Sequence, residues 1–420
     1  MSQDLLIILS LGAALLAGCG TRGDAIGGSA EGGTEDGAEA IEVAPAPPTT
    51  RTGKVGKKSK SGGADAGKAK ARIGPSPTAQ RTVLPFNNAT AIARVGDGLL
   101  TLYRQDGDAR LARSRAGTEP EVITVASGNI GGLAMATDGD AVLVTFSRGN
   151  GLYAALSEDG GATFAEAWTV VSGSGSPQGP AARLWRSEAG LRAVVLYHLG
   201  NQITGQLYTA TLMDGKWGAP TRLDGDGEGS WGTLEGEGDW TVAVWKDFKH
   251  REREPTLYSA VLTDPSGGWS EPRSLNQRGA DPSLCIDGGG RLHMAFQQAF
   301  RQLRYARSDD KGQTWSAARS VEETPGLFGR VTCHPSNPTG VAVTWEKFIG
   351  DGSNKDDHVK VVGLARSGDR GETFTMIPVE NDRTSQVRSS AVMLEDGTLE
   401  VSWVDVRGEP TVKWETVPVE

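Results

Sequence analysis

A strand-like segment that ends in an aromatic residue recurs seven times in the chain, and this repeat limits the possible folds more than any other feature. Each copy is an apolar run that ends in Tyr, Phe or Trp before polar residues, as in LVTFSR, VVLYHL and AVTWEK. The seven aromatic residues are Tyr103, Phe146, Tyr197, Trp245, Phe296, Trp345 and Trp403. Their spacing of roughly fifty residues is the period of β-propeller blades. Short alternating strands with turn residues between them surround each copy, and no long amphipathic helix competes with this pattern.

The repeats predict an all-β fold, a seven-bladed β-propeller built from four-stranded antiparallel blades. The last repeat ends with TVKWETVPVE after its third strand, so its fourth strand is missing. RTVLPF, at residues 81–86, precedes the first repeat and is in a position to supply that strand. Closure of this kind removes an open sheet edge that would otherwise invite aggregation. We therefore expect the propeller to occupy residues 81–420 and its last blade to be closed by the N-terminal strand.

Three of the repeats contain a shared motif, Ser-x-Asp-x-Gly-x-Thr-aromatic, which reads SEDGGATF, SDDKGQTW and SGDRGETF. The motif residues are Ser157, Asp159, Gly161, Thr163 and Phe164; Ser308, Asp310, Gly312, Thr314 and Trp315; and Ser367, Asp369, Gly371, Thr373 and Phe374. A short Asp side chain can accept hydrogen bonds from the backbone of its own turn, and Gly can take a positive φ. Because a catalytic centre is usually unique in a chain, we expect the recurring motif to be structural.

The motif resembles the Asp-box, or BNR, repeat of sialidases and related propellers, and the resemblance covers about 340 residues. It implies that each box is the turn between the third and fourth strands of a blade. It also implies that the boxes lie at the end of the propeller opposite the ligand site. Sialidases have six blades, so a six-bladed sialidase-type propeller is the alternative fold.

The second strand of each blade runs towards that other end, the mouth, so polar residues after each aromatic are expected there. From the polar residues at the ends of the second strands and the starts of the first strands, we predict a ligand site of Arg104, Arg148, His198, Asp247, Arg330, Lys347, Arg388 and Asp405. Their mixed charge suits a pocket for a glycan, another acidic ligand or an envelope protein. The alternative is a solvated rim without a ligand.

The resemblance also raises the question of sialidase activity, which uses an arginine triad, a tyrosine nucleophile activated by a glutamate, and an acid/base aspartate. Arg330 and Arg388 stand where two members of the triad would be. The family's first arginine lies in a Phe/Tyr-Arg-Ile-Pro motif, but the corresponding stretch here is FNNATAIARVG. No tyrosine stands out as a nucleophile. We therefore expect a binding module without catalytic residues. The alternative is an exo-sialidase-type glycoside hydrolase. A third hypothesis is an assembly factor, like the photosystem assembly propellers.

One segment has the spacing of a calcium-binding loop. DGDGEGSWGTLE matches the template at Asp224, Asp226, Glu228, Gly229 and Glu235, but no helices flank it. The five histidines are scattered without zinc spacing. We expect no cofactor and no metal, with calcium as the remaining alternative.

The start of the chain has the pattern of an export signal. LLIILSLGAALLAGC is too short for a comfortable membrane span and resembles a bacterial lipoprotein signal, with a lipobox at residues 16–19. The resemblance implies that residues 1–18 are removed, that Cys19 is lipidated, and that Gly20 favours the outer over the inner membrane. Residues 19–80, rich in Gly, Ala, Pro and charged side chains, are expected to be a disordered tether.

These features predict a lipid-anchored protein of the bacterial cell envelope. Its partners would be the membrane, through the lipid, and a glycan or envelope protein. The formal net charge of −9 argues against nucleic-acid binding. We expect the protein to be monomeric.

Cysteine usage leads to one further expectation. Lipidation of Cys19 leaves Cys285 and Cys333, which lie on first strands of successive blades in an oxidising compartment. When the two strands are aligned on the turns that follow them, Cys285 falls one position earlier than Cys333. A one-residue offset places side chains on opposite faces, and successive blades pack opposite faces together. We predict a disulfide between them, with two buried free thiols as the alternative.

Overall fold

The computed structural model describes residues 84–85, 91–115, 118–173, 175–201, 203, 205–249, 254–298, 302–349, 359–379, 386–406 and 411–418. The expected signal peptide, Cys19 and the whole of the expected tether lie outside these residues. Within them, no helix has the length and apolar character to cross a membrane.

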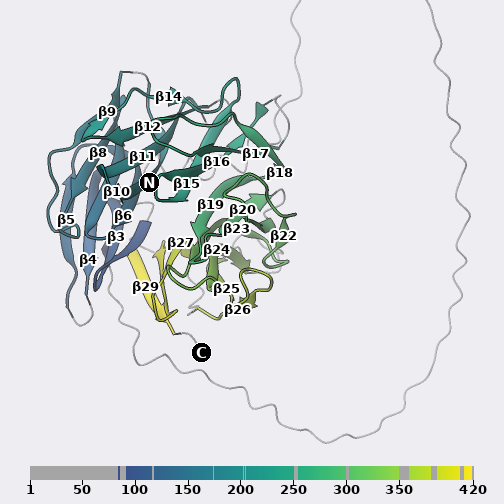
Figure 1. Ribbon diagram of the computed structural model, residues 1–420. Coiled ribbons are helices and arrows are strands. Elements are labelled where there is room, and N and C mark those ends of the chain that lie inside the picture. The colour runs from purple at the N-terminus through teal and green to yellow at the C-terminus, as the bar shows by residue number, and fades with distance from the viewer. Residues whose placement is uncertain are drawn as a thin grey trace, which may run out of the picture. The chain divides into compact units, whose positions relative to one another are not determined.

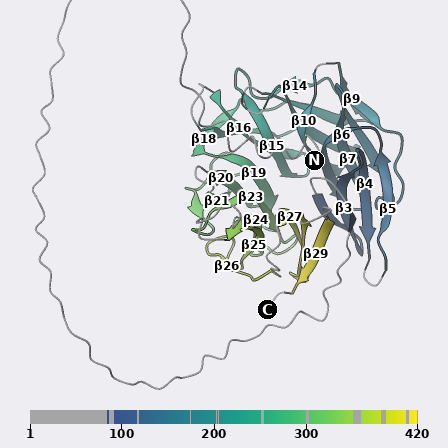
Figure 2. The ribbon, with the colours of Figure 1, turned by 180° about the vertical axis from the view of Figure 1, so that it is seen from behind.

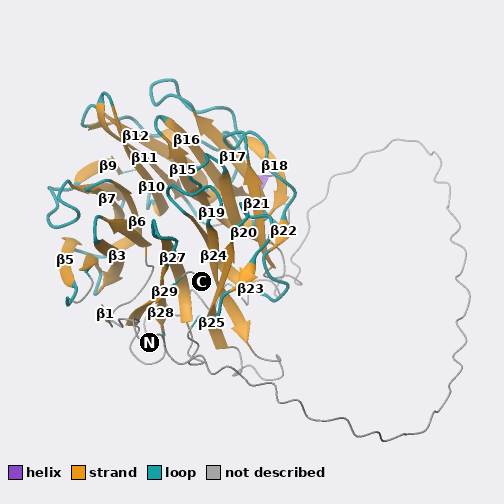
Figure 3. Ribbon diagram, turned by 60° about the horizontal axis from the view of Figure 1, so that its bottom comes forward, coloured by secondary structure: helices purple, strands orange, loops and turns teal. Residues whose placement is uncertain are grey.

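Seven antiparallel sheets follow one another around a ring, and each sheet is one blade. In Figure 1 the strand colours pass around the ring from blue through green to yellow, and Figure 2 shows the same ring from behind. Figure 3 shows that loops join most of the strands, with a short helical turn drawn near β18. Seven blades of this kind confirm the predicted all-β propeller, and the six-bladed alternative is wrong.

The blades are numbered along the chain, and within each the innermost strand comes first. Blade one comprises β2 (Ala91–Val95), β3 (Gly98–Gln105), β4 (Asp108–Ser114) and β5 (Glu121–Ala126). Blade two comprises β6 (Ile130–Asp138), β7 (Ala141–Arg148), β8 (Gly151–Ser157) and β9 (Trp168–Ser172). Blade three comprises β10 (Gln178–Ser187), β11 (Gly190–Leu199) and β12 (Gln206–Met213), with β13 (Lys216–Trp217) and β14 (Thr221–Arg222) both paired to β12.

Blade four comprises β15 (Gly229–Glu237), β16 (Trp240–Asp247), β17 (Thr256–Leu262) and β18 (Arg273–Arg278). Blade five comprises β19 (Ala280–Ile286), β20 (Leu292–Gln298), β21 (Gln302–Ser308) and β22 (Arg319–Ser320). Blade six comprises β23 (Gly326–Cys333), β24 (Val341–Ile349), β25 (Val359–Ser367) and β26 (Thr375–Met376). Blade seven comprises β27 (Gln386–Met393), β28 (Leu399–Asp405), β29 (Thr411–Val417) and β1 (Leu84–Pro85).

Blade seven is completed by the N-terminal strand. Leu84 pairs with Val412 and Pro85 pairs with Thr411, antiparallel to β29. Leu84 and Pro85, within RTVLPF, therefore supply the strand that the last repeat lacks, as their sequence position predicted. Proline is tolerated here because β1 is the outermost strand of its blade.

The core lies between the blades, and the repeated aromatic residue stands at its centre. Trp245 and Trp345 are completely buried, and the other five aromatic residues at this position are buried as well. In three blades a tyrosine of the third strand stacks on it, and the Phe146 and Tyr153 ring centroids are 5.7 Å apart. The fifty-residue period is therefore the period at which the fold buries one large ring per blade.

The three Asp boxes adopt the same hydrogen-bonded turn between the third and fourth strands. Asp310 accepts hydrogen bonds from the Thr314 backbone N–H at 2.8 Å, the Thr314 hydroxyl at 2.6 Å and the Ser308 hydroxyl at 2.8 Å. The turn's glycine, Gly312, has a φ of 80°. The boxes at Asp159 and Asp369 repeat these bonds. Each Asp carboxylate is thus occupied by its own turn.

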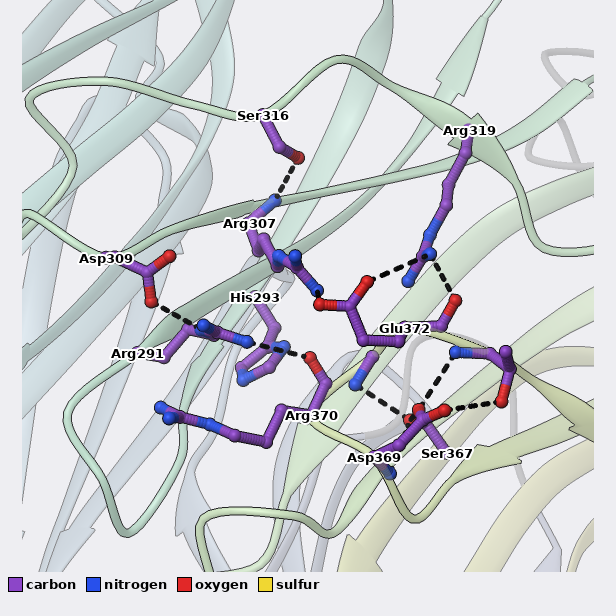
Figure 4. A network of polar contacts seen from close by, with 12 residues as sticks. Arg291, His293, Arg307, Asp309, Ser316, Arg319, Ser367, Asp369, Arg370 and Glu372 are labelled. Atoms are coloured by element: carbon purple, nitrogen blue, oxygen red, sulfur yellow. Dashed lines mark hydrogen bonds and ion pairs between the residues drawn. The ribbon is translucent and has the colours of Figure 1, made fainter.

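The box of Asp369 also ties two neighbouring blades together. Figure 4 shows the contacts between blades five and six, where Glu372, in the box of Asp369, forms ion pairs with Arg307 and Arg319. Arg291 donates a hydrogen bond of 3.3 Å to the carbonyl of Arg370 in the same box. At this end of the propeller, polar contacts therefore hold blades five and six together.

A disulfide joins the same two blades through their first strands. Cys285 on β19 and Cys333 on β23 are bonded, with a Cα–Cα distance of 5.7 Å. This is the predicted pairing, and the alternative of two free thiols does not hold in this structure.

Candidate functional site

At the mouth, the innermost strands share a local irregularity. Six of them, β6, β10, β15, β19, β23 and β27, contain a register shift near this end. The corresponding residues in these bulges, here called the bulge positions, are Gly131, Gly179, Trp231, Asp281, Phe328 and Arg388. All except Gly131 have φ between 46° and 56°. A bulky residue in this left-handed region is strained, and such strain is concentrated at functional sites.

The residue after the repeated aromatic lies beside the bulge of the next blade. The ring of His198, in blade three, is 5.3 Å from that of Trp231, in blade four. Glu346, in blade six, accepts a hydrogen bond of 2.9 Å from the backbone N–H of Arg388, in blade seven. We call the bulge positions, Arg330, and the seven residues that follow the repeated aromatics (Arg104, Ser147, His198, Lys246, Gln297, Glu346 and Val404) the mouth ring.

Positive charge gathers on the side of the mouth ring formed by blades six, seven and one. Arg330 and Arg388 are both exposed to solvent, although neighbouring protein atoms partly desolvate their guanidinium groups. Partial loss of solvent lowers the pKa of Arg388, Glu346 raises it, and the nearby charges of Arg330 and Arg104 lower it further. Arg330 makes no ion pair within the described part of the chain, and its one hydrogen bond goes to the carbonyl of its neighbour Gly329. Because arginine remains protonated in proteins, these three side chains carry positive charge.

The acidic groups next to these arginines are already engaged. Glu346 is 2% exposed, and its Oε2 pairs with the ammonium of Lys360 at 2.8 Å. Its Oε1 accepts the backbone N–H of Arg388. Burial lowers the pKa of both Arg330 and Lys246, and the negative charge of Asp281 partly offsets this effect. The carboxylates therefore position the cations without cancelling all of their charge.

The opposite side of the mouth ring contains a buried histidine and a buried lysine. His198 is fully buried, and neither of its ring nitrogens has a hydrogen-bond partner within the described structure. Burial lowers the pKa of His198 to about 4, and the charge of Lys246 contributes. Lys246 is 8% exposed, and burial lowers its pKa too. His198 is therefore neutral near pH 7.

Four of the eight predicted residues do not face the mouth ring. They stand two positions after the aromatic, so strand alternation turns them to the other face of the blade. Asp247 accepts the backbone N–H groups of Glu228 and Lys249, and Asp405 pairs with Lys413 at 2.6 Å. Lys347 pairs with Glu322. The guanidinium of Arg148 lies 4.8 Å from the centre of the Tyr153 ring. The other four, Arg104, His198, Arg330 and Arg388, belong to the mouth ring.

Two bulge positions, Trp231 and Phe328, were not among the predicted residues. Strict alternation gives no sign of a bulge, which inserts one extra residue and redirects a side chain. A signal was nevertheless present, because a glycine follows each of them, at Gly232 and Gly329. Glycine inside a strand pattern often marks a bulge.

The calcium-like segment does not form a loop around a metal position. Asp224 accepts hydrogen bonds from Arg222 at 2.7 Å and from the backbone N–H of Gly229 at 2.9 Å. Glu235 lies on β15 and accepts the N–H of Gly236. Among the described residues, no cluster of His, Cys, Asp or Glu side chains could hold a metal ion.

None of the six tyrosines belongs to the mouth ring. Tyr103 and Tyr197 occupy the repeated aromatic position and are buried. The other four, Tyr153, Tyr208, Tyr258 and Tyr305, lie on third strands, where their rings contact other aromatic rings. Burial raises the pKa of Tyr197 to about 12, which does not suit a nucleophile at neutral pH.

A cavity of about 230 Å³ lies at the other end of the propeller, beside Asp159, Arg113 and Arg115. It is lined by the turn between β2 and β3 and by the Asp box of blade two. It is therefore separate from the mouth ring.

Comparison with known proteins supports the fold. No protein family and no curated protein matches the sequence. Among solved structures, the polysaccharide lyase Uly1 is similar with a TM-score of 0.52 and 10% identity, over 79% of this chain and 90% of its own. YCF48 bound to D1 peptide gives a TM-score of 0.46 and 15% identity over 81% and 97%. The α-L-arabinofuranosidase Arb93A from Fusarium graminearum gives 0.45 and 11% over 69% and 92%. At 10% identity, what Uly1 shares with this chain is the fold.

Proposed function

We propose that the mouth ring binds an acidic glycan and does not cleave it. The observation that carries this proposal is the group of Arg330, Arg388 and Arg104 at a water-accessible, strained part of the propeller. Guanidinium groups bind carboxylate and sulfate oxygens in a bidentate manner. The nearest buried carboxylate, Glu346, already pairs with Lys360. Uly1, which shares the fold, is named as a polysaccharide lyase, so this fold is compatible with a carbohydrate ligand.

The second candidate is a sialidase-type glycoside hydrolase, and the proximity of the three arginines favours it. Against it, the tyrosines are occupied in packing and lie outside the mouth ring. An envelope protein with an acidic segment would meet the same guanidinium groups, so it is an outcome of the binding test.

We further propose that a bacterial lipoprotein anchor presents the propeller from the cell envelope, at the outer membrane and as a monomer. The support is the lipobox that ends at Cys19 and the composition of the segment that follows it. The Cys19→Ser variant should be released from membranes or accumulate as uncleaved precursor. Mature protein of this variant in the detergent phase would contradict the anchor.

The binding proposal is tested on an array of uronate-, sulfate- and sialate-bearing glycans together with neutral glycans. The wild-type propeller should bind acidic members, and less tightly as salt rises, because exposed charges are screened. Arg330→Gln should weaken binding by about tenfold or more, the size of one lost charge-assisted hydrogen bond. The control is Arg115→Gln, which removes the same charge at the opposite end, where Arg115 pairs with Asp97 at 3.3 Å.

Equal losses in the two variants, or no acidic glycan bound by the wild type, would overturn the proposal. Turnover of a fluorogenic sialoside by the wild type would establish the second candidate instead. Binding of an acidic envelope protein but of no glycan would replace the glycan with a protein ligand.

A further inference from the structure

The energetic cost of left-handed backbone conformations differs between the residues that adopt them. Among the residues that the structure describes, ten non-glycine residues have positive φ, and five of them are Asp or Asn, which tolerate this conformation. Of the other five, Lys311 and Arg370 belong to Asp-box turns. The remaining three, Trp231, Phe328 and Arg388, are all bulge positions of the mouth ring. The residues for which this backbone is most costly therefore face the candidate site.

The fold itself does not require a side chain at a bulge position. The equivalent residue in blade three is Gly179, which has a φ of 53°. Glycine would relieve the strain at Trp231 and Phe328 as well, because it reaches positive φ without a steric penalty. Both positions instead hold large aromatic rings. We therefore infer that the rings have a role of their own, for which the protein tolerates the backbone strain.

The two rings are also accessible. Phe328 is 39% exposed and is one of the few large apolar side chains on the described surface. Trp231 is partly exposed, and its indole rests on His198 and is held close to Gly179. Asp281, in blade five, lies between these two blades and interacts electrostatically with Lys246 and Arg330. Around the ring the order is thus aromatic, acid, aromatic, then the arginines.

We propose that Trp231 and Phe328 are stacking platforms for the sugar rings of an acidic oligosaccharide, whose acid group binds Arg330 and Arg388. This inference rests on the proposed function and specifies its ligand. The C–H face of a pyranose is apolar and packs on an aromatic ring, while its polar edge remains available for hydrogen bonds. Platforms in two different blades favour an oligosaccharide over a single sugar. The negative charge of Asp281 directs the acid group towards blades six and seven.

The left-handed φ supplies a test that separates function from folding. Phe328→Gly removes the platform and at the same time relieves the backbone, so its unfolding temperature should equal or exceed that of the wild type. Its affinity for trigalacturonate should fall about tenfold or more, since the buried face of one aromatic ring is lost. Trp231→Gly should weaken the same interaction, and Phe328→Trp should restore it. Affinity for inorganic sulfate, which needs only the arginines, should stay within about twofold.

Lys311→Gly is the matched control, because it relieves a φ of 60° at the opposite end and should leave both affinities unchanged. Wild-type affinity for trigalacturonate in Phe328→Gly and Trp231→Gly would refute the platforms while leaving the acidic site intact. A clear loss of stability in Phe328→Gly would also refute them, since the ring would then serve the fold. If the wild type binds neither sulfate nor trigalacturonate, the proposed function itself fails.

Discussion

Replacement of Asp310 by alanine tests whether an Asp box serves the fold. Asp310→Ala removes an acceptor of three hydrogen bonds, from the Thr314 N–H, the Thr314 hydroxyl and the Ser308 hydroxyl. A hydrogen bond to a charged group contributes about 1.5–3 kcal/mol when buried, and less where water competes. Asp310 is partly exposed, so the three bonds together should contribute about 2 kcal/mol, with a range of 1–3 kcal/mol.

Urea denaturation measures the effect as a lower midpoint with an unchanged slope. The neighbouring residue supplies the control. Asp309 is 64% exposed and forms a surface ion pair with Arg291, so Asp309→Ala should lower stability by only about 0–1 kcal/mol. Asp310→Asn should fall between the two, because it retains one acceptor oxygen but loses the charge.

The hydrogen bonds of Asp310 also predict that its contribution to stability depends on pH. Burial raises the pKa of Asp310, but hydrogen bonds from Thr314 and Ser308 outweigh this and hold it below the ordinary value. A carboxylate with a depressed native pKa stabilises fully above its unfolded pKa, about 3.9, and loses this contribution as pH falls through its native value. The gap between wild type and Asp310→Ala should therefore narrow below about pH 4. Equal midpoints for Asp309→Ala and Asp310→Ala, or lost glycan binding at an unchanged midpoint, would refute a structural box.

Three further changes have expected outcomes. Gly371→Ala should destabilise by about 3 kcal/mol or more in thermal unfolding, because φ is 76° and the new Cβ would overlap the Tyr305 hydroxyl. Gly368→Ala meets nothing within 4 Å and should be neutral. The native pKa of His198, about 4, lies below its unfolded value. The neutral, buried ring therefore contributes fully to the free energy of unfolding above about pH 6.5, and this contribution falls by up to roughly 3 kcal/mol as the pH drops to 4. His198→Gln should flatten that part of the urea-midpoint profile, and an unchanged slope would contradict the assignment. Replacing Cys285 and Cys333 by serine opens a sequence separation of 48 residues and should cost up to about 4 kcal/mol, whereas an unchanged melting temperature under non-reducing conditions would argue against the bond.

The fold was largely predictable because its signals are local and repeated. One buried aromatic per blade gives the period, as the complete burial of Trp245 and Trp345 shows. The unpaired third strand of the last repeat indicated closure by residues 81–86, and β1 pairs with β29. The Cys285–Cys333 disulfide could be predicted from the one-residue offset of the two cysteines, because side chains alternate between the two faces in the straight part of each strand.

The mouth was predictable only in part, since its geometry departs from that alternation. Arg330 and Arg388 could be found because they are charged residues near the start of a first strand. Trp231 and Phe328 were harder to find, because an aromatic residue in a strand normally indicates core, and the signal for a bulge was the glycine that follows each of them. Only the bulge turns them outward, and the bulge at Trp231 lies beside His198 of the preceding blade, a contact that strand alternation alone does not predict.

The closure of blade seven has a consequence for the order of folding. Blades one to six are each made from one continuous stretch of chain, so each can form from contacts that are close in sequence. Blade seven instead joins Leu84 to Val412, and the entropy of closing so long a loop must be overcome before that pairing stabilises anything. We therefore expect ring closure to be the slow step, with β29 exposed as an unpaired edge until β1 arrives. An early-folded arc of blades that waits for its two ends to meet is the species most open to chaperone binding or to pairing with another chain.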